Sequence, residues 1–191
     1  MAEHYHLWYC SAMSYYDDIY EIAVDNHYLV STADARGAGV PAVELAKLAS
    51  RGKLEHVARG LYRLARYVPD GGDPYAVAVA RVGGGAYLYG ESVVALLGLA
   101  PTSPDRIWVA TPRRVRLKEP PAGLRIVRGE PGYEPTAYEG VPSQRAADAI
   151  ASCLATMMPE RVEQAADEAL RQGYVTPRER GSLAEALGVR A

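Results

Sequence analysis

The chain has 191 residues, of which 49% are hydrophobic and 23% are charged, and a formal net charge of -2 at pH 7. This composition excludes an intrinsically disordered chain, and the near-neutral charge excludes nucleic-acid binding through bulk basicity. The length suffices for one domain of ordinary size or two small ones.

The ends of the chain and its cysteines carry little chemistry. Cys10 and Cys153 lack metal-ligand spacing, so we expect free thiols in a reducing compartment. No apolar run is long enough to cross a bilayer and no export signal precedes the first helix, so the cytoplasm is the expected location. Residues 1–13 are expected to form an N-terminal extension. His4 and His6 within it have no third metal ligand, which favours a plain tail over a metal site.

Three helices are predicted in the first third of the chain. Apolar residues at helical spacing indicate an amphipathic helix over 14–26. Ser31 followed by Asp34 is a capping-box pattern, which predicts the start of a short second helix. A third helix is expected to begin at Pro41 and to end just before Gly52.

A β-hairpin is predicted to follow the third helix. Segments 54–58 and 61–68 alternate in polarity, and Arg59 and Gly60 between them suit a tight turn. Three helices followed by a two-stranded hairpin is the order of a winged helix-turn-helix. We therefore expect a DNA-binding domain over 14–68.

The rest of the chain predicts a mixed α+β domain over 75–191, after a linker rich in proline and glycine at 69–74. Helices are expected over 75–81 and 91–97. Strands are expected over 106–111, 123–129 and 133–140, and three C-terminal helices from 143 onward, divided at Pro159 and Pro177. Strands followed by helices favour an α+β arrangement over a wound parallel sheet.

Basic residues are concentrated in the predicted winged helix. Between 32 and 68 there are seven basic and three acidic residues. On the third helix, Lys47, Ser50 and Arg51 fall on the face opposite the apolar one. In a major groove these side chains would reach base edges or phosphates, because arginine and lysine suit the acceptors of guanine.

The predicted hairpin adds further cations. Arg59 is expected at its turn, with Lys53, His56, Arg63 and Arg66 around it, in positions to contact phosphates or a minor groove. A winged helix that binds protein instead, through a solvated basic face, is the alternative interpretation. The basic excess on the elements that face nucleic acid in this fold favours DNA.

A second basic segment lies at 111–121, where Arg113, Arg114, Arg116 and Lys118 occur within a few residues. A second nucleic-acid contact and a docking site for an acidic partner are both compatible with it. A solvated loop explains the same pattern equally well.

No catalytic, metal or cofactor site can be assembled from the sequence. The glycines at 83–85 lack the spacing of a phosphate loop, so a turn before a helix is favoured. Glu163 and Asp167 lie in a charged helical region that a solvated face explains. No nucleophile elbow and no acidic nuclease set occurs, so we expect a protein that is not an enzyme.

Five segments in order along the chain resemble AbiEi-family antitoxins of type IV toxin-antitoxin systems. They are LVSTADARGAGV and HVARGLYRL, followed by YGESVVALLGL, RIWVATP and GVPSQRAADAIASCL. Each is weak alone, and their order, over 14–187, is the stronger signal. The resemblance implies a winged-helix domain that represses its own operon at inverted repeats in double-stranded DNA. It also implies a C-terminal domain that counteracts a nucleotidyltransferase-like toxin.

Carried onto this chain, the resemblance implies DNA contacts by Lys47, Ser50, Arg51 and Arg59. The resemblance also makes Arg113, Arg114 and Arg116 candidates for contacting DNA or for the antitoxin function. The leading hypothesis is therefore a DNA-binding antitoxin and autorepressor. A winged-helix protein-interaction module, or a general transcription regulator with no paired toxin, is the alternative.

Overall fold

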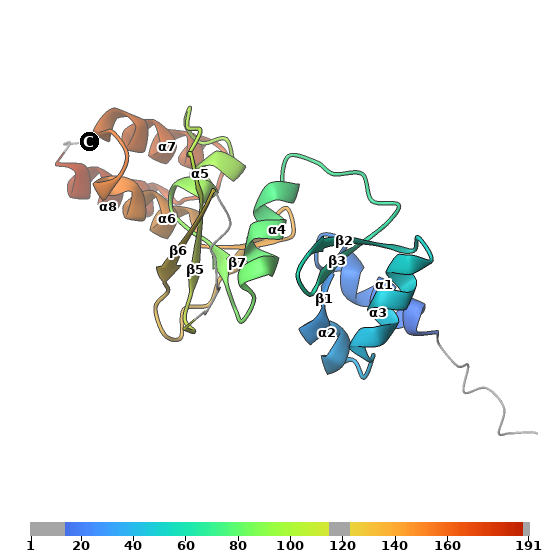
Figure 1. Ribbon diagram of the computed structural model, residues 1–191. Helices are drawn as coiled ribbons and strands as arrows, with labels where there is room; N and C mark the ends of the chain where they lie inside the picture. Colours follow the sequence, from blue (N-terminus) through green and yellow to red (C-terminus); the bar gives the residue numbers. More distant parts are fainter. Residues whose placement is uncertain (1–13, 115–122, 189–191) are drawn as a thin grey trace, which may run out of the picture. The chain divides into compact units, whose positions relative to one another are not determined.

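A computed structural model describes residues 14–114 and 123–188 (Figure 1). The chain divides into two compact units, Met1–Val68 and Pro69–Ala191, each with its own sheet. The predicted α+β class is confirmed. The expected extension at 1–13, with His4, His6 and Cys10, and the basic residues Arg116 and Lys118 lie outside the described residues.

The first unit contains the three predicted helices and the predicted hairpin. Its elements are α1 (Tyr15–Val24), β1 (Leu29–Ser31), α2 (Thr32–Gly37), α3 (Ala42–Ser50), β2 (Leu54–Ala58) and β3 (Leu61–Leu64). Strand β1 is a correction to the sequence analysis, because it pairs with β3 and gives a three-stranded sheet of order β1-β3-β2. Strand β3 also ends at Leu64, earlier than the predicted end at 68.

Local signals explain where α2 and α3 begin and end. The Ser31 hydroxyl accepts a hydrogen bond from the Asp34 backbone N–H (3.1 Å), and the Asp34 carboxylate accepts one from the Ser31 backbone N–H (3.0 Å). This is the predicted capping box. Pro41 is the residue just before α3, where its missing N–H costs no helix hydrogen bond. Gly52 has a φ of +70°, which lets the chain turn from α3 into β2.

The core of the first unit draws on all three helices and the sheet. Its buried members are Ile19, Ala23, Val30, Ala35, Val40, Leu45, Leu54 and Leu64. Leu45 is the one residue of α3 that is fully buried. One face of α3 is therefore anchored in the core and the opposite face is left to solvent.

The second unit contains a five-stranded mixed sheet of order β6-β5-β4-β8-β7. The strands are β4 (Tyr87–Leu88), β5 (Ile107–Thr111), β6 (Leu124–Arg128), β7 (Thr136–Tyr138) and β8 (Val141–Ser143). Pairs β4–β8 and β5–β6 are parallel, and pairs β4–β5 and β7–β8 are antiparallel. Strands β5, β6 and β7 are confirmed, whereas the short β4 and β8 were not predicted.

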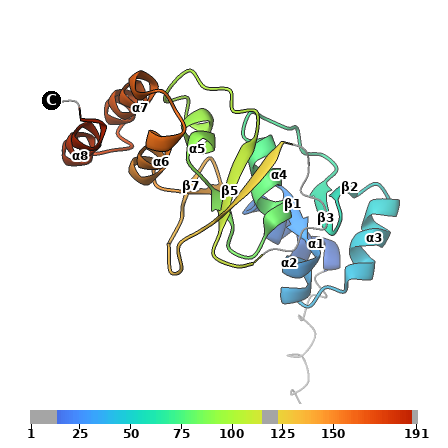
Figure 2. The same ribbon diagram turned by 60° about the vertical axis from the view of Figure 1, so that its left-hand side comes forward.

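The predicted helices of the second unit are also confirmed. They are α4 (Asp73–Val82), α5 (Glu91–Leu96), α6 (Ala146–Ser152), α7 (Pro159–Arg171) and α8 (Pro177–Leu187), with a short 3-10 turn, η1 (Cys153–Ala155), after α6. Helix α4 begins inside the segment expected to be the linker. Helices α6, α7 and α8 gather at one end of the unit (Figure 2). No helix in the described part of the chain is long and apolar enough to cross a membrane.

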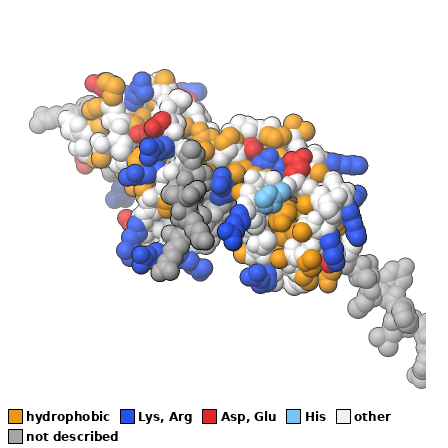
Figure 3. Space-filling view, viewed as in Figure 1, with side chains coloured by type: hydrophobic (Ala, Val, Ile, Leu, Met, Phe, Trp, Pro, Cys, Tyr) orange, Lys and Arg blue, Asp and Glu red, His pale blue; other side chains and the backbone are white. Residues whose placement is uncertain are grey.

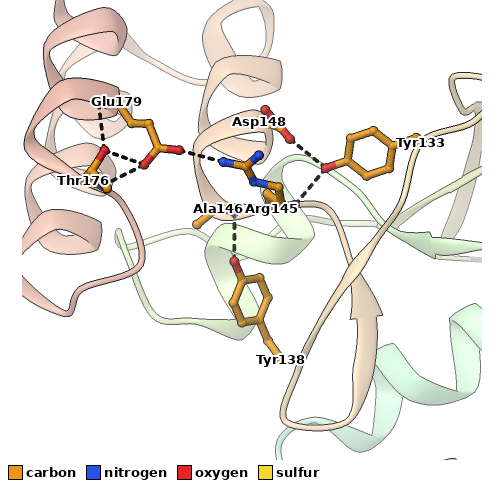
Figure 4. Close-up of polar contacts among 7 residues, drawn as sticks. All are labelled: Tyr133, Tyr138, Arg145, Ala146, Asp148, Thr176 and Glu179. Carbon is orange, nitrogen blue, oxygen red and sulfur yellow. Dashed lines mark hydrogen bonds and ion pairs between the residues drawn. The ribbon is translucent and has the colours of Figure 1, made fainter.

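Polar side chains fasten α6 to the segment before β7 and to the start of α8 (Figure 4). The Tyr133 hydroxyl donates to the Asp148 carboxylate (2.8 Å) and accepts from the Arg145 backbone N–H (2.9 Å). The Arg145 guanidinium donates to the Glu179 carboxylate (2.7 Å). Arg145 and Asp148, which belong to one of the segments that resemble AbiEi antitoxins, thus hold the fold of the second unit.

Candidate nucleic-acid interface

Helix α3 presents a small mixed surface to solvent. Its exposed residues, and the residue that follows it, are Ala42, Val43, Ala46, Lys47, Ser50 and Arg51. Val43 is 56% exposed, which is high for a large apolar residue. The face that sequence analysis assigned to DNA is therefore accessible, and it combines apolar side chains with two cations.

Some polar residues of this face already have ion-pair or hydrogen-bond partners within the protein, and one has no ion pair among the described residues. Lys47 pairs with Glu44 one turn earlier (2.7 Å), and the Ser50 hydroxyl donates to the Lys47 carbonyl (2.8 Å). Arg51 follows the last residue of α3 and makes no ion pair within the described residues. A cation at this end of a helix is favoured by the helix dipole. Arg51 is thus an uncompensated charge at the end of α3, unlike Lys47.

The turn of the hairpin carries Arg59 and lies against the start of α2. The Thr32 backbone N–H donates to the Gly60 carbonyl (2.8 Å). Gly60 has a φ of +71°, and a Cβ placed there would lie 3.0 Å from the Thr32 hydroxyl. The turn is therefore tied down, and it holds Arg59 exposed and without an ion pair in the part of the chain that the structure covers.

Lys53 and Arg66 do not gather around Arg59, which corrects the sequence analysis. Both lie at the open end of the hairpin, where the Ala65 backbone N–H donates to the Lys53 carbonyl (3.1 Å). The length of a five-residue strand, roughly 16 Å, separates that end from the turn. Residues close in sequence to a hairpin turn are far from it in space once the strands extend.

Arg63 is also not at the expected surface. It lies on the central strand β3, opposite Leu29 of β1 and Glu55 of β2, and its side chain is 8% exposed. Its guanidinium carbon is 5.2 Å from the centre of the Tyr67 ring. Because β1 was not predicted, β3 was expected to be an outer strand of a simple hairpin, and the burial of Arg63 could not be foreseen.

Arg113 and Arg114 of the second unit line a cavity of about 520 Å³ together with Thr111 and Arg128. Sequence analysis did not single out Arg128. The parallel pairing of β5 with β6 places Arg128 opposite Thr111. The signal that could have found it is an arginine at the end of β6 and another two residues after the end of the neighbouring parallel strand β5.

Side chains with metal-ligand chemistry do not cluster in the structure. Among the described residues, no group of three or more His, Cys, Asp or Glu side chains is placed to hold a metal ion.

The order of helices and strands, the exposed face of α3 and the wing beside it define the first unit as a winged helix-turn-helix. Residues 17–65, nearly the whole of the described first unit, match the family of transcriptional regulators described as AbiEi antitoxins. The resemblance to AbiEi antitoxins is thus confirmed for this part of the chain. That family is one of transcriptional regulators and is not a class of enzymes.

The whole chain has more distant likenesses. The crystal structure of the RV2827C protein from Mycobacterium tuberculosis is 19% identical, with 93% of this chain and 82% of that chain covered. The TM-score of 0.38 is too low to define a common overall fold. No curated protein matches the sequence.

Proposed function

We propose that the chain is a DNA-binding antitoxin that represses its own operon and counteracts a nucleotidyltransferase-like toxin in the cytoplasm. The observation that carries the proposal is the exposed α3 face, ending in Arg51, beside a wing that holds Arg59, within a segment that matches AbiEi antitoxin regulators. Lys and Arg side chains lie along the edges of this unit, in the right-hand part of Figure 3, with few acidic side chains among them.

In this proposal α3 enters a major groove. Arg51 and Lys47 reach the acceptors on guanine, and the exposed Val43 suits contact with a thymine methyl group. Lys47 has to break its ion pair with Glu44 before it can contact a base or a phosphate, which costs free energy. Arg51 has no ion pair to break among the described residues. Ser50 completes the face with a hydroxyl that can donate or accept.

The wing supplies a contact of a different kind. Arg59 at the hairpin turn binds a phosphate, which orients the domain on DNA without reading sequence. Two copies of the chain on inverted repeats place two α3 helices in grooves about one helical turn apart. This arrangement accounts for repression at an operator in the chain's own upstream region.

The DNA part is tested by fluorescence anisotropy with a labelled duplex from the upstream region and a shuffled duplex of the same composition. Arg51→Ala should weaken binding to the upstream duplex about tenfold and bring it closer to the shuffled one. Arg59→Ala should weaken both duplexes alike. Arg171→Ala, on α7, is the matched control and should change neither. Equal loss on both duplexes for Arg51→Ala contradicts the assignment of α3.

Salt dependence tests the electrostatic part. If about five phosphates are neutralised, the logarithm of the affinity falls with a slope between about -4 and -5 against the logarithm of the salt concentration. A slope near zero would rule out phosphate contacts as the source of binding.

The toxin part is tested with the adjacent reading frame. A nucleotidyltransferase-like protein encoded there should arrest growth when expressed alone, and co-expression of this chain should restore growth. Rescue by a variant with both Arg51→Ala and Arg59→Ala would separate neutralisation from repression. Growth arrest that persists with the intact chain would contradict the antitoxin role and favour a transcription regulator with no paired toxin.

A further inference from the structure

A groove of about 790 Å³ in the first unit has a composition that the proposed operator contact does not explain. Four tyrosines line it: Tyr16 and Tyr20 from α1, Tyr28 before β1, and Tyr67 after β3. Three cations also line it, Lys53, Arg66 and Arg51, the last of which belongs to the proposed operator contact as well, and its lining contains no acidic side chain. The groove lies at the open end of the hairpin and not at the wing turn.

One wall of the groove is a supported pair of aromatic rings. Tyr28 and Tyr67 stack with centroids 4.9 Å apart and an angle of 25° between the rings. The guanidinium carbon of Arg63 lies 5.2 Å from the centre of the Tyr67 ring. A hydrogen bond joins the Tyr67 hydroxyl to His27 Nδ1 (3.2 Å). Tyr67 is thus held from several sides, while Tyr28 remains 36% exposed.

The backbone at this wall is strained. His27 and Tyr28 both have positive φ values, +54° and +57°, which are uncommon for residues other than glycine. Such conformations persist where the surrounding structure enforces them, and they concentrate at binding sites. Tyr28, which has this backbone conformation, stacks on Tyr67 in the lining of the groove.

Another wall comes from α1 and from the turn after α3. Tyr16 and Tyr20, one helical turn apart, have centroids separated by 6.4 Å, and the Lys53 ammonium lies 5.7 Å from the centre of the Tyr16 ring. Tyr20 is 47% exposed. Each wall therefore offers a partly exposed tyrosine, and cations line the same groove.

We propose that this groove binds single-stranded nucleic acid, with unpaired bases stacked on Tyr20 and Tyr28 and phosphates bound by Lys53 and Arg66. Aromatic faces beside a positively charged track are the combination that non-specific single-strand binders use. A base pair inside a duplex offers no free face for such stacking. An acidic peptide would use the cations, but its carboxylates have no flat ring to stack on the tyrosine faces, as every base does.

The test compares a labelled deoxythymidine oligonucleotide about ten nucleotides long with an abasic oligonucleotide that has the same number of phosphates. The full chain should bind the deoxythymidine strand at least about tenfold more tightly, because stacking adds to the phosphate contacts. Equal affinity for the two strands would reduce the groove to a patch of charge and overturn the proposal. Binding of a labelled acidic peptide, with no binding of either strand, would assign the groove to a protein partner and overturn it too.

Variants distinguish the rings from general damage. Tyr20→Ala should weaken binding of the deoxythymidine strand about tenfold, and Tyr20→Phe should retain it, since the ring face is kept. Alanine suits this exposed helical position, so the fold should survive the change, and thermal unfolding checks this. Arg171→Ala on α7 is the control. Full binding by a folded Tyr20→Ala variant that also carries Tyr28→Ala would contradict stacking at both sites.

This inference and the proposed function fail separately. If the intact chain does not bind the deoxythymidine strand, the groove does not bind single strands, and the proposed operator contact is unaffected. If the chain does not bind the upstream duplex, the proposed repressor role is wrong, and the proposal for the groove is unaffected.

Discussion

The thiol of Cys153 shows how the interior of the fold can keep a reactive side chain inert. It is 1% exposed in the second unit, and burial, together with the charge of Glu91, raises its pKa to about 12. Since only the thiolate reacts and the raised pKa keeps the thiol protonated, very little of the reactive form is present at pH 8. We expect a Cys10→Ser variant to show no fast reaction with a disulfide reagent at pH 8, and one thiol per chain in denaturant. Immediate reaction of the folded variant would contradict this burial.

Gly60 is the residue on which the position of the wing depends. Alanine there would have to keep a φ of +71° and would bring its Cβ within 3.0 Å of the Thr32 hydroxyl. Left-handed backbone costs residues with a Cβ about 1–2 kcal/mol, so Gly60→Ala should lower the free energy of unfolding by about that amount. Gly37→Ala is the matched control, because a Cβ there meets nothing within 4 Å. Urea unfolding that shows equal stability for both variants would contradict the tight packing of the turn.

At the scale of elements, the carboxylate of Glu179 caps the start of α8. The pKa of Glu179 is held below its ordinary value of 4.5, first by hydrogen bonds from the Thr176 backbone N–H and hydroxyl, and then by Arg145. A lowered pKa in the folded state means that the stabilisation is present above the unfolded pKa and is lost as the pH falls through the folded one. Glu179→Gln should therefore be less stable than the parent at pH 7, and the difference should shrink below about pH 4. Thermal unfolding across this range checks it, and a difference independent of pH would contradict the role of the charge.

The elements that could be predicted are those whose signals are local. The helices begin and end at capping residues, prolines and glycines, so α3 was found close to its observed bounds and α7 begins at the predicted Pro159. Strands β1, β4 and β8 have three residues or fewer, too few to show a period of two. They exist because distant strands pair with them, which a local pattern does not contain. The same reason explains Arg63, whose burial follows from the unpredicted pairing of β1 with β3.

At the scale of the whole molecule, sequence reasoning located the α3 face but not the tyrosine groove. The residues of the α3 face lie within one helix, so helical spacing alone groups them. The groove joins Tyr16 to Tyr67 across the length of the first unit, and its members meet only when α1, β3 and the turn after α3 pack together. Sequence analysis assigned no role to Tyr16 or Tyr20. A net charge of -2 likewise conceals a groove whose lining is free of acidic side chains.

Comparing the full chain with its first unit alone tests whether the second basic segment, which contains Arg113 and Arg114, contacts DNA. A fragment of residues 14–68 contains a complete core and all the residues proposed at the operator, so we expect it to fold alone and to bind the upstream duplex. Each phosphate contact contributes about 0.9 to the salt slope, so contacts by Arg113 and Arg114 would make the slope of the full chain steeper than that of the fragment by about 2. Both arginines line a cavity beside Arg128 in the second unit and are not required by the proposed operator contact. We therefore expect equal slopes in anisotropy titrations. A steeper slope for the full chain that returns to the fragment's value with Arg113→Ala and Arg114→Ala together would place this second surface on the DNA.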